Sequence, residues 1–165
     1  MEIIMSKIFA LLLDITGIQS YIFSSNKLRE NAGASYLISQ SYASFLKEST
    51  QSLFPQEKFE EDAWKKQPDK ILIENHPFEI GYIGGGNALI FFQEHEKAIE
   101  WVKDWTKRLL VVSPGITAAI ASSEWDTKDL TDPNQYPKKR DELLSRLQEK
   151  KGRFIPQTIL PQHGI

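Results

Sequence analysis

The sequence contains no cysteine among its 165 residues, so disulfide bonds, thiolate metal sites and cysteine nucleophiles are excluded. The apolar run from Ile8 to Leu13 is far too short to span a bilayer. It ends at Asp14 without the small-residue cleavage site that a secretory signal requires. We therefore predict a cytoplasmic protein with no membrane partner, in which this run is a buried strand.

The chain also lacks a strong charge of either sign. Its formal net charge of -2 gives no overall attraction to nucleic acid or to an anionic membrane. Hydrophobic residues make up 41% and charged residues 25%, which is typical of a globular protein and, at this length, of one domain. The histidines lack a ligand-like spacing, so no metal cluster is predicted from them. The tryptophans, Trp64, Trp101, Trp105 and Trp125, are expected to pack in the core or on the surface rather than to stack on bases.

The hydrophobic pattern predicts an α+β domain with elements in the order β-α-β-β-α-β and an additional C-terminal helix. The expected strands are residues 7–15, 79–83, 88–92 and 116–122, with a further strand piece at 70–74 before a turn at 75–77. The expected helices are residues 18–47, either in two pieces or as one helix with an irregular middle near Gly33, then 96–112 and 137–151. Polar connectors are expected at 49–69 and 126–136.

This ferredoxin-like order predicts a four-stranded antiparallel sheet with the long helices packed on one face. Strands 7–15 and 88–92 are the most apolar and are expected to be the central pair. Residues 1–153 are expected to form the domain, and residues 154–165 a linker or tail. The inward faces are expected to carry Ile99, Val102, Trp105 (or Thr106) and Leu109 in one helix, and Leu143, Leu144 and Leu147 in the last.

Two features are expected to meet at one end of the sheet. Asp14 ends the first strand, and Thr16 is a candidate N-cap for the helix that follows. Backbone N–H groups at 16–19 would suit phosphate oxygens, and a carboxylate beside them would suit Mg²⁺. The tip at 84–87 is a glycine-rich hairpin turn. Each feature also has a plain structural interpretation, Asp14 as a cap and the tip as an ordinary turn.

Together these segments resemble a known family. Residues 14–23, D-I-T-G-I-Q-S-Y-I-F, are similar to the D-x-S/T-G-I-Q-x-(F/Y)-I signature that opens the first palm domain of the large subunit of type III CRISPR effector complexes. Residues 27–29 and 33–37 resemble the L-R and G-x-S-Y-L segments that follow in that family. Residues 82–89 resemble its glycine hairpin, which corresponds to the G-G-D-D/E-F tip of active palm and diguanylate-cyclase domains. The resemblance covers roughly residues 7–125.

The resemblance implies a ferredoxin-like palm domain that has lost most of its metal ligands. Asp14 matches the first metal ligand of active palms, but Gly86 and Asn87 stand where the two hairpin acids are expected. The implied cofactor is Mg²⁺ with ATP, and Asp14 is the implied metal ligand. Ser35 either lines a base pocket or lets the backbone pack closely. The implied nucleotide-binding residues are Asp14, Thr16, Gly17, Gln19, Ser35, Gly84, Gly85, Gly86 and Asn87.

The resemblance implies that the chain is a palm domain of a type III CRISPR antiviral-defence protein. Such a domain would bind nucleotide and serve as a scaffold, but would not be catalytic alone. Its partners would be a nucleoside triphosphate, a second palm domain, and other CRISPR effector subunits with guide RNA. The basic residues flanking the last helix are either a solvated face or a phosphate or RNA contact. Two alternatives are an active nucleotidyl cyclase or oligoadenylate synthase, and a ferredoxin-like protein-interaction module without nucleotide.

Overall fold

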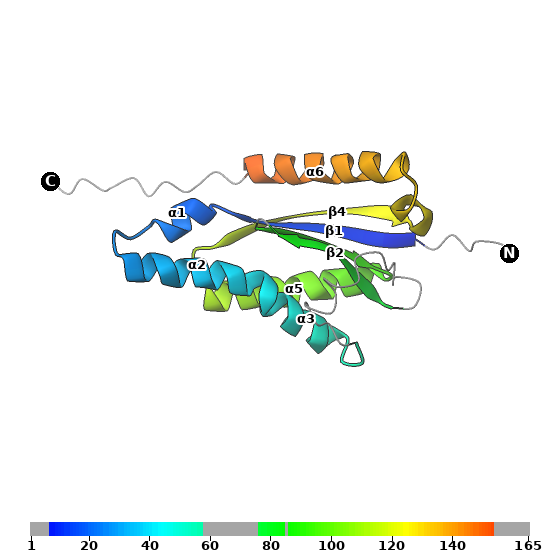
Figure 1. Ribbon diagram of the computed structural model, residues 1–165. Helices are drawn as coiled ribbons and strands as arrows, with labels where there is room; N and C mark the ends of the chain where they lie inside the picture. The colour runs from blue at the N-terminus through cyan, green and yellow to red at the C-terminus, as the bar shows by residue number, and fades with distance from the viewer. Residues whose placement is uncertain (1–6, 58–75, 85, 154–165) are drawn as a thin grey trace.

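The computed structural model describes residues 7–57, 76–84 and 86–153. Four antiparallel strands form one sheet in the order β2-β3-β1-β4 (Figure 1). The strands are β1 (Lys7–Thr16), β2 (Phe78–Gly84), β3 (Asn87–Phe92) and β4 (Thr117–Asp126). The predicted α+β, ferredoxin-like class and the central β1–β3 pair are confirmed.

Helices cover both faces of this sheet, so the prediction that the long helices lie on one face is wrong. The helices α2 (Leu28–Ala43), α3 (Phe45–Leu53) and α5 (His95–Val112) lie below the sheet in Figure 1, and α6 (Gln135–Arg153) lies above it. The apolar character of β1 on both sides follows from this arrangement, because a strand covered on both faces has no solvent-facing side.

The helical stretch predicted at 18–47 is three helices, and its interruptions are not where Gly33 predicts them. A short helix, α1 (Ile18–Ile22), is separated from α2 by residues 23–27, and α3 begins directly after Ser44. Gly33 lies inside α2 without breaking it. A glycine costs a helix interior only about 1 kcal/mol relative to alanine, which packing of the helix is sufficient to offset.

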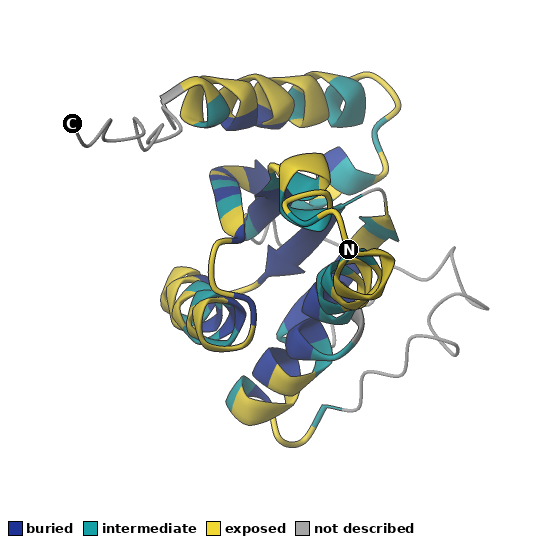
Figure 2. Ribbon diagram, turned by 90° about the vertical axis from the view of Figure 1, so that its left-hand side faces the viewer, coloured by how far each residue is buried: buried dark blue, intermediate teal, exposed yellow. Residues whose placement is uncertain are grey.

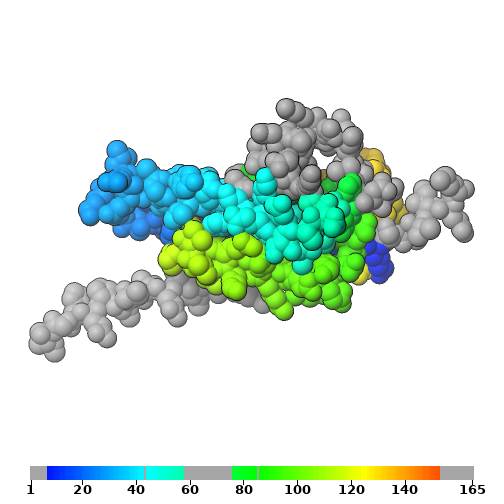
Figure 3. Space-filling view, turned by 90° about the horizontal axis from the view of Figure 1, so that it is seen from below, coloured from blue at the N-terminus to red at the C-terminus, as the bar shows by residue number. Residues whose placement is uncertain are grey.

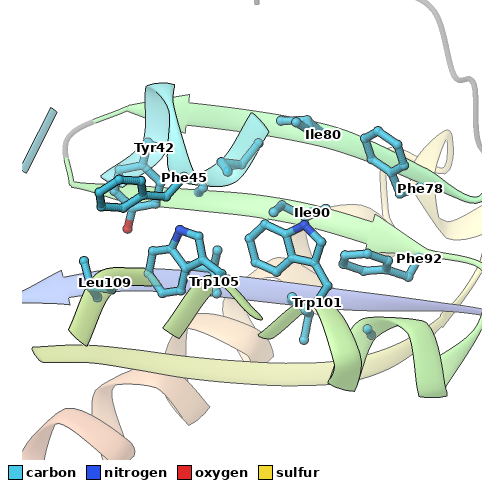
Figure 4. Close-up of a cluster of buried hydrophobic side chains, with 14 of the residues drawn as sticks. Tyr42, Phe45, Phe78, Ile80, Ile90, Phe92, Trp101, Trp105 and Leu109 are labelled. Carbon is cyan, nitrogen blue, oxygen red and sulfur yellow. The ribbon is translucent and has the colours of Figure 1, made fainter. Parts of the chain in front are cut away.

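The larger core lies between the sheet and the lower helices, and two tryptophans of α5 fill its centre (Figure 4). Trp101 and Trp105 are fully buried, and their rings stack with centroids 6.0 Å apart. Each indole N–H finds a partner, since Trp105 donates to the backbone oxygen of Ser41 at 2.9 Å and Trp101 to the hydroxyl of Thr50 at 3.1 Å. These bonds tie α5 to α2 and α3.

The buried face of α5 contains Trp101, whereas the predicted face contained Ile99. Its buried residues are Ala98, Trp101, Trp105 and Leu109, whereas Ile99 is 42% exposed. Burying the larger aromatic surface of Trp101 outweighs burying Ile99. Seen from below, α3 and α5 lie side by side (Figure 3). Arg108 of α5 joins them, with hydrogen bonds to Glu48 at 2.6 Å and to Asp104 at 2.7 Å.

A second, smaller core lies between the sheet and α6. Leu143 and Leu147 are buried against even-numbered residues of β1 and against Trp125, whereas Leu144 is 38% exposed. The buried part of α6 lies on its side toward the sheet (Figure 2). The predicted polar loop at 126–136 contains a short 3₁₀ helix, η1 (Thr127–Leu130), and the first turn of α6. The predicted strand at 70–74, residue 75 of the predicted 75–77 turn, residues 58–69 of the connector and the tail at 154–165 lie outside the described residues. In the described part of the chain, no helix has the length and apolar character needed to cross a membrane.

Candidate functional site

Asp14 and the hairpin tip lie together at one end of the sheet, as the sequence predicts. Asp14 of β1 is directly opposite Asn87 of β3 in the strand register. Residues opposite each other in an antiparallel pair have Cα atoms about 4.5–5.5 Å apart. The prediction of their adjacency, on which the site argument depends, is confirmed. We call the group formed by residues 14–19 and the described hairpin residues Gly84, Gly86 and Asn87 the β1–hairpin corner; the predicted site residue Gly85 lies outside the described residues.

The described residues of the hairpin tip are held by contacts with β1, α1 and α2. Gly84 pairs with Asn87, and Gly86 has a φ of 86°, which L side chains rarely adopt. The Gly86 carbonyl accepts two hydrogen bonds, from the Ile15 amide at 2.9 Å and from the Tyr42 hydroxyl at 2.7 Å. A Cβ atom at Gly86 would lie 2.6 Å from Cδ1 of Ile18. The positive φ therefore favours glycine at this position, and any side chain here would also have to displace the end of the Ile18 side chain.

Tyr42 of α2 contacts the corner through a hydrogen bond that the sequence did not reveal. Its position in the predicted helical stretch at 18–47 carried no sign of its bond to the hairpin. The hydroxyl is buried, and this burial, together with the negative charge of Asp14, raises the pKa of Tyr42 well above its ordinary value of 10. Tyr42 is thus a neutral donor that fixes the tip against α2.

This burial predicts a loss of stability in alkali. Above pH 10 the unfolded chain loses the Tyr42 proton while the folded chain keeps it, so the free energy of unfolding falls as pH rises. Replacing Tyr42 by phenylalanine should reduce this decline, and at neutral pH should cost about 1 kcal/mol through the lost hydrogen bond. Urea unfolding measured between pH 8 and 11 tests both effects. The exposed Tyr36, replaced in the same way, serves as the control; an equal decline in wild type and Tyr42→Phe would contradict the assignment.

The other predicted residues of the corner are placed differently. Thr16 is not an N-cap: it ends β1, and its hydroxyl contacts the Thr117 hydroxyl across the sheet. The N-cap of α1 is Gly17, with a φ of 68° and no side-chain cap bond. Gln19 is exposed in α1. Ser35 is exposed on α2, seven residues before Tyr42 and so about 10 Å from it along the helix axis.

Asp14 faces α6 and pairs with a lysine there. Its even-numbered position places it on the same sheet face as Leu12, which packs in the smaller core. The side chain is 11% exposed and forms an ion pair with Lys151. Leu143, Leu147 and Lys151 follow one another at intervals of four residues, so they share one face of α6. The face that buries the two leucines therefore also carries the ammonium group to Asp14.

Other cations of α6 bind the backbone of β4, which is an edge strand of the sheet. Three of these side chains donate to carbonyls two residues apart, a spacing at which the carbonyls point to the same side of the strand. The pairs are Lys139 with Glu124 at 3.4 Å, Arg146 with Ser122 at 3.0 Å and Lys150 with Ile120 at 2.6 Å. The sequence left the basic residues near the last helix as either a solvated face or a phosphate contact. Three cationic side chains of α6 therefore have a structural role. They cover the edge of β4, whose backbone carbonyls would otherwise be unpaired acceptors.

The residues of the corner do not fit a resident Mg²⁺ ion. Magnesium prefers near-octahedral oxygen ligands and is usually held by one or two carboxylates plus substrate phosphates. Here the Asp14 carboxylate is already engaged by Lys151, Asn87 offers a neutral amide and Gly86 offers no side chain. Across the described ranges, no group of three or more His, Cys, Asp or Glu side chains is arranged to hold a metal ion.

No family model and no curated protein sequence matches this chain. Among solved structures, it is similar to a Csm1–Csm4 cassette in complex with one ATP, with a TM-score of 0.64 and 13% identity over 88% of this chain and 19% of that one. Csm1 from T. onnurineus gives a TM-score of 0.63 and 14% identity, over 88% of this chain and 20% of that one. The diguanylate cyclase SiaD of Pseudomonas aeruginosa, bound to its activator SiaC, gives 0.53 and 12%, over 89% and 47%.

These similarities show that the chain has the palm and cyclase type of fold. At these low sequence identities, the similarities support an inference about the fold only. The chain spans about a fifth of the length of the Csm1 proteins and less than half of SiaD.

Proposed function

We propose that this chain is a nucleotide-binding palm domain that has lost the metal ligands needed for nucleotidyl transfer and supports a catalytic partner. Residues 1–153 form the palm, and residues 154–165 are a linker or tail. ATP is the proposed ligand, and it binds without a resident metal ion. The protein belongs to type III CRISPR antiviral defence, as a part or a stand-alone relative of a large subunit. A second palm domain and effector subunits with guide RNA are its proposed partners.

One observation carries the proposal: Asp14 and Asn87 are register partners, which brings the end of β1 and the glycine tip together at one corner. The fold that holds this corner is the one shared with a Csm1–Csm4 cassette that binds ATP and with a diguanylate cyclase. The nucleotide site is proposed at Asp14, Thr16, Gly17, Gln19 and the tip at 84–87. Ser35 on α2 is the proposed position for contact with the base.

The proposal predicts weak ATP binding with a dissociation constant of about 100 μM or higher, or roughly -5 kcal/mol. Binding is weak because one engaged carboxylate cannot recruit Mg²⁺, which usually accompanies a triphosphate. In a titration followed by amide NMR shifts, the largest changes should fall at residues 14–19 and 84–87. Adding Mg²⁺ should leave the dissociation constant of ATP within about threefold, since that ratio corresponds to less than 1 kcal/mol.

Adding a negative charge at the corner provides the sharper comparison. Replacing exposed Gln19 by glutamate adds a negative charge beside the proposed phosphates and should weaken binding several-fold. The matched control is the same change at Gln51, which is exposed in α3 and lies outside the corner. Equal affinities for the two variants, or shifts that avoid the corner, would place the nucleotide elsewhere.

A second candidate function, a protein-interaction module without nucleotide, is favoured by a different observation. Three large apolar side chains near α1 and in α2 are exposed to solvent: Phe23 at 69%, Leu28 at 84% and Tyr36 at 63%. Exposed apolar groups mark an interaction surface when they form one patch. The ATP titration separates the two functions, because a pure interaction module gives no shifts at residues 14–19 and 84–87.

A further inference from the structure

We infer that the ammonium group of Lys151 takes the place of a metal ion at Asp14 and fastens the end of α6 across the corner. The inference begins with Asp14, whose residue is only 7% exposed. A buried carboxylate without a partner is costly, so a position of this kind requires a compensating charge or a set of hydrogen bonds. In the structure the compensating charge comes from the chain itself.

The position of Lys151 on α6 makes this pairing a built feature of the fold. The lysine lies in the last turn of a 19-residue helix, where a cation also interacts favourably with the helix dipole. Leu143 and Leu147 anchor the same helix face in the smaller core and so set the height and rotation of the lysine above β1. Lys150, the next residue, reaches a different acceptor, the carbonyl of Ile120 in β4 at 2.6 Å.

The pairing closes the corner to divalent cations in two ways. The ammonium engages one of the two carboxylate oxygens of Asp14, and its positive charge repels a second cation at the same place. Neighbouring Asn87 and Gly86 supply no negative charge that would compete with this repulsion. A divalent ion can therefore bind at Asp14 only when the Lys151 ammonium group is displaced from the carboxylate. This inference shares its location with the proposed nucleotide site but does not depend on ATP binding.

The test uses Mn²⁺ as the probe and its paramagnetic broadening of assigned amide signals as the readout. In the 165-residue wild type, millimolar Mn²⁺ should broaden the signals of residues 13–15 and 87 no more than it broadens the signals of exposed acidic residues elsewhere in the chain. Replacing Lys151 by methionine keeps most of the apolar stem and removes the charge. This variant should show broadening at residues 13–15 and 87 at a Mn²⁺ concentration lower by about tenfold or more, the effect of losing one adjacent charge.

Lys150→Met is the matched control, because it removes the neighbouring charge while the Lys151–Asp14 pair stays intact. Adding Asp14→Asn to Lys151→Met should abolish the gained broadening. The inference is wrong if Lys150→Met gains as much as Lys151→Met, if the gain survives Asp14→Asn, or if wild type already binds Mn²⁺ at Asp14 as tightly as the variant. Since ATP is absent from this experiment, its outcome is separate from that of the proposed nucleotide function.

A second comparison decides the matter if Lys151→Met does not fold. Asp14→Asn is isosteric and should speed amide hydrogen exchange in residues 148–153 by about tenfold, as the end of α6 opens more often. The control is Asp141→Asn, which removes a carboxylate paired with Arg140 at the surface of the same helix. Equal exchange at residues 148–153 in the two variants would show that Asp14 does not hold α6, and would overturn the inference.

Discussion

Replacing Trp105 by alanine is expected to lower the free energy of unfolding by about 3–5 kcal/mol, the usual range for truncating a buried tryptophan. Trp105 has no exposed surface, and its ring stacks on both Trp101 and Tyr42, with centroids 6.0 Å and 5.9 Å away. The truncation also leaves the Ser41 carbonyl without its donor. A loss of this size is a large part of the total stability of a domain.

Urea unfolding of two further variants separates packing from hydrogen bonding. Trp105→Phe keeps much of the apolar surface but loses the indole N–H, and should cost about 1–3 kcal/mol for the lost buried hydrogen bond to Ser41, plus a smaller term for lost packing. Ile99→Ala changes a residue of the same helix that is 42% exposed, and should cost less than either tryptophan variant. A Trp105→Ala cost no greater than that of Ile99→Ala would contradict the placement of Trp105 at the centre of the core.

The sequence predicted the features that depend on pattern and order along the chain. Strand periodicity and the element order were sufficient to place β1 beside β3 and Asp14 beside Asn87, because these follow from topology. Gly86 was predicted as part of a turn, and its positive φ agrees with that. The register of a tight hairpin is largely set by its own turn, so little tertiary information was needed.

The partners of Asp14 and Gly86 were not predictable in the same way. Periodicity identified Leu143 and Leu147 as a buried face, but it does not say which side of the sheet that face covers. Without that side, Lys151 could not be matched to Asp14, which lies 137 positions earlier in the sequence. Tyr42 was hidden for a related reason, since a tyrosine on an apolar helix face gives no sign of where its hydroxyl reaches.

The interruption of the first helical stretch illustrates a different limit. Intrinsic propensity pointed to Gly33, but α2 is continuous there and the chain turns instead around residues 23–27 and at Ser44. Propensity is a weak signal that tertiary contacts override. Here α2 brings Ser41 and Tyr42 to the core and to the hairpin, and both contacts require an unbroken helix up to Ala43.

The isolated chain is expected to make no detectable cyclic nucleotide or oligonucleotide from ATP or GTP, with either Mg²⁺ or Mn²⁺. In nucleotidyl transfer a 3′-hydroxyl must lose its proton and attack the α-phosphorus while pyrophosphate leaves, and anionic ligands usually hold the ions that stabilise both developing charges. The corner offers one carboxylate, and Lys151 already engages it. Lacking that stabilisation should cost several kcal/mol, or a rate lower by about 10³-fold or more than in an active palm.

Adding a carboxylate to the corner tests whether metal binding can be restored separately from catalytic activity. Gly86 is a poor place for an acid, because its φ of 86° and the 2.6 Å approach of Ile18 both oppose a side chain. Asn87→Asp is therefore the variant to use. It is combined with Lys151→Met so that neither carboxylate at the corner is paired with Lys151. The combination should bind Mn²⁺ more tightly than either single variant without restoring turnover, because a second palm is still needed to complete the site. Product chromatography after long incubation is the assay, and a product peak in wild type that disappears in Asp14→Ala would show that the chain is an active cyclase.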